Sequence, residues 1–178
     1  ASALGGNASL MFLAGGPRRS ASAAIAERRA ASSAQASFAI GAAISRSFAD
    51  QGAEVAAGFS SNRDRAQQFI DELCGEGMKG SIHQGNVGSA DDCRRTVNEV
   101  IERHGRLDIL INNAGITIDK TVLKMTDEDW HKVITVNLSG AFFTSQAVLP
   151  HMIERGSGRI INISSIIGEM GNIGQANY

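Results

Sequence analysis

Residues 107–115 read LDILINNAG, and this stretch decides the fold class. Its first six residues are strongly apolar and predict a buried strand of a sheet covered on both faces. Asn112 and Asn113, with the small residues after them, suit a crowded turn beside a ligand. We therefore expect an interior strand whose carboxyl end lies at a binding site.

Strands and helices are predicted to alternate on both sides of this stretch. Further strands are expected at residues 53–59, 80–84 and 159–164, and helices from residue 40, over residues 63–74, after a cap at Ser89, and from Thr126 towards Met152. The last helix is expected to bend near Gly140, and Pro150 to shorten it. The alternation predicts an α/β fold, a doubly wound parallel sheet of the Rossmann-like kind with helices on both faces.

Residues 1–37 differ from the rest of the chain. They are rich in Ala, Ser and Arg, and Glu27 is their only acid. This bias is typical of a transit peptide, but it also fits a linker or a damaged sequence, and the missing initiating Met favours the last. We expect residues 9–14 to supply the first strand and residues 17–37 to form an insertion, helical or disordered. Residues 38–178 then form a partial dinucleotide-binding and catalytic domain.

Composition narrows the class of protein. A chain of 178 residues with 43% hydrophobic and 20% charged residues is expected to form one globular domain. A net charge of -1 gives no electrostatic reason to expect nucleic acid or an anionic membrane as a partner, and no apolar run approaches the length of a membrane span. Cys74 and Cys93 are expected to be reduced thiols in a cytoplasmic protein without a metal site.

Three polar side chains are candidates for chemistry. Asn137 lies on an otherwise apolar helix face, where a buried amide needs partners. Ser165 follows the last strand, where its hydroxyl could donate a hydrogen bond to a substrate carbonyl. The phenol of Tyr178 could protonate that carbonyl oxygen. Each residue alone also fits a purely structural or surface role.

Two motifs resemble one known family. The turn at residues 112–115 and the run from Arg159 to Tyr178, with its Ser-Ser pair and a Tyr thirteen residues after Ser165, resemble the short-chain dehydrogenase/reductase family. Within it the chain is most similar to the 3-oxoacyl-ACP reductases and acetoacetyl-CoA reductases, over residues 40–178. The resemblance implies NADPH-dependent reduction of a 3-oxoacyl thioester, carried by ACP or CoA, to the (3R)-3-hydroxyacyl product in fatty-acid or polyhydroxyalkanoate pathways.

The resemblance also implies roles for the three side chains and an assembly. Asn137 would hold a water in a proton relay, Ser165 would polarise the substrate, and Tyr178 would be the acid. The family has a Lys four residues after the Tyr, one helical turn further on, and this sequence stops before it. We expect this chain to be weak or inactive although its parent is an enzyme, and the parent to be a homotetramer built through the long helix.

The expected phosphate-binding turn is atypical. Such a turn needs glycines because the backbone approaches the cofactor pyrophosphate. Ile40 and Gly41 match the family, but Gln35 and Ala39 hold the positions of its first two glycines. Gly15 and Gly16 could contribute if the insertion loops out. An ordinary helix start at Gly41 is an equally good interpretation.

Three further turns are expected to bind the cofactor. Ser60, Ser61 and Arg63 follow the second strand without an acid before Asp64, which favours the 2′-phosphate of NADPH, although the two serines could simply cap the next helix.

Asn86 and Val87 resemble the pair that lines the adenine, although Asn86 could simply be a turn residue. Asn113, Ala114 and Gly115 would touch the cofactor ribose.

Substrate contacts and a rival function remain open in the sequence. Asp119, Lys124 and Gln175 match positions that meet the acyl-thioester arm, but surface roles for them are more probable than binding. The rival function is a degenerate, non-catalytic reductase that acts only in binding or oligomerisation. Gln35 and Ala39 favour the rival, and the intact set of Asn137, Ser165 and Tyr178 opposes it.

Overall fold

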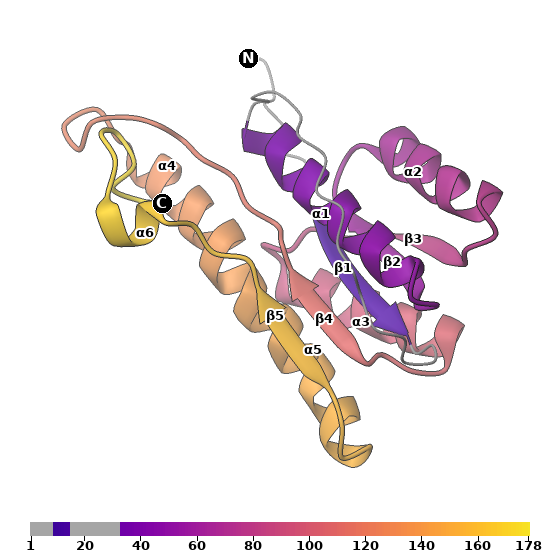
Figure 1. The fold of residues 1–178 in the computed structure, drawn as a ribbon. Coiled ribbons are helices and arrows are strands. Elements are labelled where there is room, and N and C mark those ends of the chain that lie inside the picture. Colours follow the sequence, from indigo (N-terminus) through magenta and orange to yellow (C-terminus); the bar gives the residue numbers. More distant parts are fainter. Residues whose placement is uncertain (1–8, 15–32) are drawn as a thin grey trace.

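In the computed structural model, residues 9–14 and 33–178 are described. Their elements, in chain order, are β1 (Ser9–Ala14), α1 (Ser33–Ala49), β2 (Glu54–Phe59), α2 (Arg63–Gly75), β3 (Gly80–Gln84), α3 (Ala90–His104), β4 (Ile109–Asn112), α4 (Asp127–Ile134), the π-helical segment η1 (Thr135–Ser139), α5 (Gly140–Glu154), β5 (Arg159–Asn162) and α6 (Ile167–Met170). Figure 1 shows one twisted sheet between layers of helices.

The sheet has the strand order β3-β2-β1-β4-β5 and a core on each face. Neighbouring residues of a strand point to opposite faces, so the sequential pair Phe12 and Leu13 divides between two separate clusters, as does the pair Leu110 and Ile111. One cluster packs under α3 and α5, and the other under α1 and α2. The doubly wound α/β class is thereby confirmed.

The sheet is mixed, and the expectation that it is fully parallel is wrong for one strand. Residues 9–14 do form β1 in the centre, but β1 runs antiparallel to both β2 and β4. Ser9 pairs with Phe59 and Ala14 with Glu54. Reversal of the strand leaves the alternation of Phe12 and Leu13 between the two faces unchanged.

Helix α1 begins earlier than the sequence motif implied. It starts at Ser33, so Ile40 and Gly41 lie in its middle and not in a turn before it. The physical reason is helix propensity: Gln35 and Ala39 are better helix formers than glycine by roughly 0.5–1 kcal/mol each, which lets the helix extend towards its start. The expectations for Gly15, Gly16 and residues 17–32 fall outside the described residues.

Helix caps explain where the other helices begin. The side chain of Asn62 accepts from Arg65 N at 3.0 Å and caps α2, so the interpretation in which Ser60 and Ser61 cap this helix is wrong. Ser89 caps α3 as predicted. Thr126 and Asp129 form a reciprocal capping box at the start of α4.

The long helix is continuous from α4 through η1 to α5. Its irregularity is the π-helical segment just before Gly140, and Pro150 is accommodated without ending α5. By length and composition alone, residues 127–154 could cross a membrane, although the sequence led us to expect no such run. In this fold one face of the α5 part of the helix packs on α3 and β4.

Candidate active site

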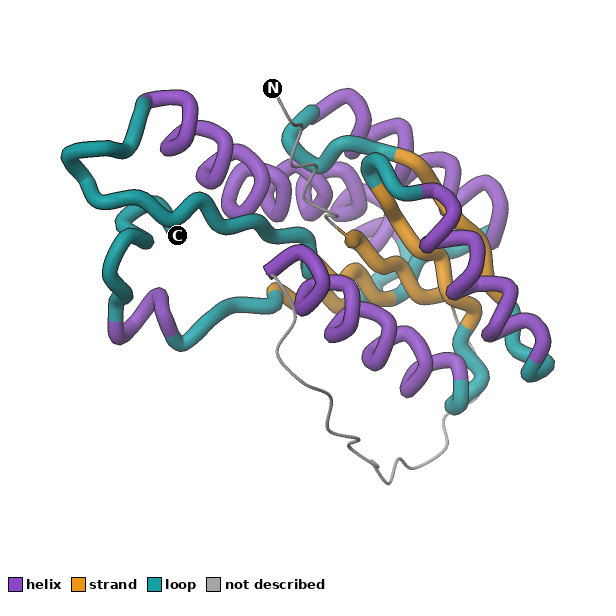
Figure 2. The backbone as a smooth tube through the Cα atoms, turned by 90° about the horizontal axis from the view of Figure 1, so that it is seen from above, coloured by secondary structure: helices purple, strands orange, loops and turns teal. Residues whose placement is uncertain are grey.

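The carboxyl ends of four strands meet at one edge of the sheet. β2 runs parallel to β3, β4 runs parallel to β5, and β2 and β4 share a direction because both oppose β1. The loops that follow β4 and β5 reach away from the sheet together, towards the start of α4 (Figure 2). Ligands of open α/β sheets bind at this edge, and most of the predicted site residues follow these strands.

Ser60, Ser61 and Arg63 lie after β2, on either side of Asn62, which caps α2. Ser60 accepts a hydrogen bond from Gln84 Nε2 through its carbonyl oxygen at 3.2 Å. Ser61 and the side chain of Arg63 are exposed. Hydroxyls and a guanidinium at this place can bind a phosphate group.

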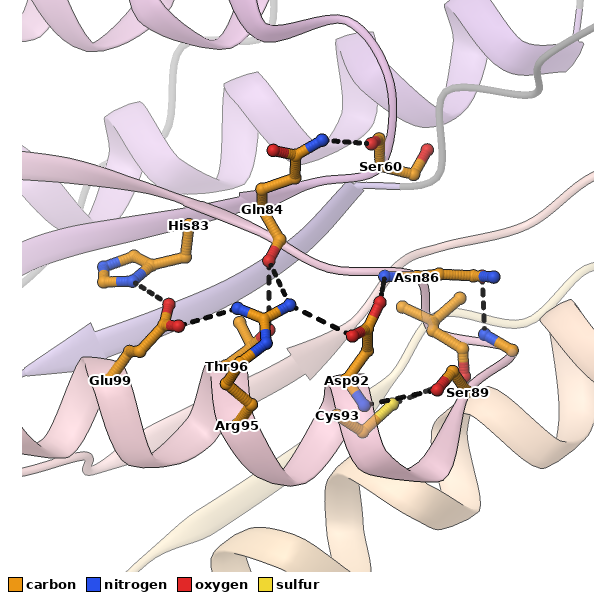
Figure 3. Close-up of polar contacts among 12 residues, drawn as sticks. Ser60, His83, Gln84, Asn86, Ser89, Asp92, Cys93, Arg95, Thr96 and Glu99 are labelled. Carbon is orange, nitrogen blue, oxygen red and sulfur yellow. Dashed lines mark hydrogen bonds and ion pairs between the residues drawn. The ribbon is translucent and has the colours of Figure 1, made fainter.

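The turn after β3 is held by α3 (Figure 3). Asp92 Oδ2 accepts from Asn86 N at 2.9 Å, and this bond, with that from Arg95, lowers the pKa of the Asp92 carboxyl. Asn86 Oδ1 accepts from Gly88 N at 3.0 Å, so Asn86 does act as a turn residue. One lone pair of that oxygen is still free to meet a ligand, and Val87 is buried beside it.

Asn112, the last residue of β4, joins three elements. Its Nδ2 donates to Asn162 Oδ1 on β5 at 2.8 Å and to Ser145 Oγ on α5 at 3.2 Å. Its Oδ1 accepts from Thr144 Oγ1 at 2.7 Å. The neighbouring Asn113 is buried as well. The sequence singled out residues 113–115 as ligand contacts, whereas Asn112 ties β4 to β5 and α5.

Asn137 lies in η1, and its side chain bonds to the backbone of Ile116, the residue after the Asn-Ala-Gly turn. Its Nδ2 donates to Ile116 O and its Oδ1 accepts from Ile116 N, both at 2.9 Å. A cavity of about 50 Å³ lies beside it, lined by Val87, Asn112, Ala114, Val136, Asn137, Gly140, Ala141, Asn162 and Ile163. A π-helical segment at such a place is frequent in functional sites.

Ser165 and Tyr178 lie further out along the loops. Ser165 is half-buried, and its Oγ accepts from Ile167 N at 3.2 Å. Tyr178 is 41% exposed, and its backbone N donates to Gln175 O at 3.1 Å. These hydrogen bonds join residues only two or three apart in the chain. Asn137 instead lies beside the strand ends at Asn112 and Asn162.

The predicted substrate residues Asp119 and Gln175 contact each other. Gln175 Nε2 donates to Asp119 Oδ1 at 3.0 Å. Lys124 is exposed in the turn before α4. Asn177, which the sequence did not single out, is buried beside Tyr178 and bonds to Ile118 O at 3.3 Å. Its position next to the predicted catalytic Tyr178 is the sequence feature that could have identified Asn177 as a site residue.

The turns after β2, β3 and β4 could contact a dinucleotide, but the described residues around Gly41 and β1 do not provide a turn for its pyrophosphate. These three turns bring Ser61, Asn86 and Gly115, which the sequence predicts to contact the cofactor, to this edge. The pyrophosphate needs free backbone amides at a glycine turn, and Gly41 lies within α1, where amides bond along the helix. The carboxyl end of β1, at Ala14, lies at the opposite edge beside Glu54. Among the described residues, no cluster of three or more His, Cys, Asp or Glu side chains could hold a metal ion.

The strand order, the two-faced core and the turns at the carboxyl edge define a Rossmann-like α/β domain. The chain belongs to the short chain dehydrogenase family, whose sequence profile matches residues 34–178. Proteins of this family are oxidoreductases that use a nicotinamide cofactor.

Curated relatives are named 3-oxoacyl-(acyl-carrier-protein) reductase. The Staphylococcus epidermidis protein is 40% identical over 143 residues, which cover 80% of this chain and 59% of the relative. The Thermotoga maritima protein is 42% identical, over 78% of this chain and 56% of its own. The Synechocystis protein is 40% identical, over 80% and 58%. The chain therefore spans less than two thirds of the relatives that it matches.

Proposed function

We propose that this chain carries the core of an NADPH-dependent reductase of 3-oxoacyl thioesters, giving (3R)-3-hydroxyacyl thioesters. One observation carries the proposal: Asn112, Ala114 and Asn137 surround one cavity at the carboxyl edge of the sheet, in a chain about 40% identical to named 3-oxoacyl-ACP reductases. The carrier can be ACP or CoA, since the residues contain no discriminating feature. Such an enzyme would work in the cytoplasm.

Three side chains would perform the proton chemistry. Ser165 Oγ would donate a hydrogen bond to the 3-oxo group, which makes its carbon more electrophilic. Tyr178 Oη would give its proton to the same oxygen. Asn137 would hold the turn that lines the pocket and a water that resupplies the proton. The bound cofactor would supply the hydride to the carbonyl carbon.

The choice of NADPH over NADH rests on the end of β2. An acid at this place would bind the free 2′-hydroxyl of NADH, and this chain has none before Asp64. Ser60, Ser61 and Arg63 would instead bind the 2′-phosphate. Capping of α2 by Asn62 supports this choice, because the exposed Ser61 is then not the cap of the helix.

The outer loops would take the thioester. We place Asp119, Lys124 and Gln175 along the acyl-carrying arm, and the bond between Asp119 and Gln175 supports their grouping on one side of the pocket. Exposed apolar side chains on these loops, Leu123 and Ile173 among them, would cover an acyl chain.

A second copy of the chain is the proposed partner. The outer face of the long helix carries Leu138, Phe142, Leu149 and Ile153, all exposed. Their spacing places them within one stripe of the helix. Pairing of this stripe between copies would generate the homotetramer that we propose for the parent enzyme.

A second function, a non-catalytic reductase-like module, is favoured by one observation. Helix α1 runs through Ile40 and Gly41, and Ala14 lies at the edge away from the site. This arrangement would deprive a dinucleotide of its pyrophosphate contacts while the apolar helix face could still mediate assembly.

Titration of the purified chain with NADPH, followed by cofactor fluorescence, tests the two functions. Saturable binding that is at least tenfold weaker for NADH, and that loses this preference in R63A, would support the reductase. A matched control is R94A, which removes an exposed guanidinium on α3. Absence of saturation in a chain that is folded by circular dichroism would reject cofactor binding and favour the module.

A further inference from the structure

The loop at residues 116–118 contacts both Asn137 and Asn177, the residue before Tyr178. At its start, the amide of Asn137 holds both the N–H and the C=O of Ile116. Two residues later, Ile118 O accepts from Asn177 Nδ2 at 3.3 Å. Because Asn177 directly precedes Tyr178, the loop fixes the place of one residue of the pair relative to the other.

The surroundings of Asn177 define its orientation. The residue is 4% exposed, whereas Tyr178 is 41% exposed. Its Nδ2 lies between two carbonyl oxygens, Ile118 O and, at the outer limit of a hydrogen bond, Asp129 O at 3.5 Å. Only the NH₂ end of an amide can donate, so the two acceptors determine which way the group points. Its Oδ1 is buried without a donor among the described residues.

Neighbouring contacts of Lys120 hold the loop at Ile118 to the segment before Tyr178 and to α4. Lys120 N donates to Gly174 O at 2.8 Å, and Lys120 Nζ pairs with Asp129 Oδ2 at 2.5 Å. The Lys120 contact also lowers the pKa of the Asp129 carboxyl. These bonds lie three or more residues before Tyr178, so Asn177 is the last buried side-chain contact before the phenol among the described residues.

We propose that Asn177 is a positioning residue for Tyr178: its amide ties the tyrosine to the loop that Asn137 holds. The catalytic consequence rests on the proposed reductase function, but the ordering of Tyr178 does not. Without the Asn177 amide, the backbone between Gly174 and Tyr178 loses its buried anchor. The phenol would then occupy many positions, and only a fraction of them would suit proton transfer.

Two variants separate the donor from the shape of the side chain. N177D has nearly the same shape, but its ionised carboxylate cannot donate to the carbonyl oxygens. N177L fills a similar volume without polar atoms. The control is N172A, which removes an exposed amide in the same segment.

The first measurement needs neither cofactor nor substrate. The chain contains one Tyr and one Trp, and Trp130 follows the Asp129 carbonyl that Asn177 contacts. Ring signals of Tyr178 in carbon–proton NMR, and energy transfer from Tyr178 to Trp130, therefore report on this anchor alone. We expect N177D and N177L, folded by circular dichroism, to narrow the Tyr178 signals and change the transfer efficiency, and N172A to leave both unchanged. Unchanged Tyr178 signals in both variants would overturn the proposal.

The second measurement tests the catalytic consequence in a chain that turns over. We expect N177D to lower kcat roughly 10- to 100-fold, with KM for NADPH within about twofold. A kcat equal to that of the unsubstituted protein, with Tyr178 disordered, would overturn the role in catalysis. A chain that never binds NADPH would reject the reductase function, and the NMR result would still decide the positioning role.

Discussion

A pair of buried histidines gives this domain a polar core at its edge strand. Ser81 Oγ lies 2.8 Å from Nε2 of His83 and 2.8 Å from Nε2 of His104. Glu54 Oε2 accepts from His104 Nδ1 at 3.0 Å, and a carboxylate can only accept. His104 in its neutral form therefore accepts from the Ser81 hydroxyl, which in turn accepts from His83 Nε2–H.

His83 makes the stability of the fold depend on pH. Burial, the largest effect, lowers the pKa of His83 despite the nearby Glu99 carboxylate. Below about pH 6.5 the unfolded chain then binds more protons than the folded chain. The contribution of neutral His83 to the unfolding free energy is therefore fully present above that pH. It is lost as the pH falls towards the folded pKa, by up to about 1.4 kcal/mol per pH unit.

Urea unfolding at a series of pH values between about 7.5 and 5, which bracket the ordinary pKa of histidine, measures this dependence. We expect H83Q to flatten the fall in unfolding free energy on acidification. H131Q, on the exposed side of α4, serves as the control and should leave the slope unchanged. An equally steep slope in H83Q would show that other groups cause the acid sensitivity.

At the scale of single elements, local patterns predicted well what depends on neighbouring residues. The caps at Ser89 and Thr126 and the strand at residues 9–14 were all predicted, since capping and hydrophobic alternation are local. The direction of β1 was not predictable, because either direction buries the same side chains. The start of α1 was misplaced because a family turn was assumed at Gly41, where the helix propensity of Gln35 and Ala39 prevails.

The direction of β1 can be tested by cross-linking. In the antiparallel register Ser9 lies opposite Phe59, and Ala14 lies about 16 Å further along β2. In a background where Cys74 and Cys93 are replaced by Ser, we expect S9C/F59C to form a disulfide on oxidation and A14C/F59C not to, since a disulfide needs Cα atoms within about 7 Å. Mass spectrometry of the oxidised chains distinguishes them, and the reverse result would establish a parallel β1.

At the scale of the whole molecule, the outer face of the long helix presents a stripe of exposed apolar side chains. Phe142 is 59% exposed and Ile153 is 73% exposed, so a charge there costs the folded monomer little but would be buried in an assembly. We expect F142E to convert an oligomer to single chains in light scattering after gel filtration. N98E, the same charge on the exposed face of α3, is the control. A monomeric unsubstituted chain, or an unchanged F142E oligomer, would reject this interface.

The candidate site was predictable to the extent that it depends on strand ends. Ala114 and Asn137 were singled out from the sequence, and the structure brings both to the lining of one cavity. The Asn177 anchor was missed because its meaning depends on Ile118, which is remote in sequence and close in the fold. The roles of Ser165 and Tyr178 stay predictions that only measurement of activity can test.

The π-helical segment at Thr135–Ser139 has a further consequence for the shape of the long helix. One residue more than a regular turn rotates everything before it by about 100° about the helix axis relative to everything after it. Within this segment Asn137 contacts the loop at Ile116, and Leu138 is exposed. Deletion of a single residue from this segment would remove that rotation. The capped start of α4, with the Asp129 contacts of Lys120 and Asn177, would then face a different side of the domain.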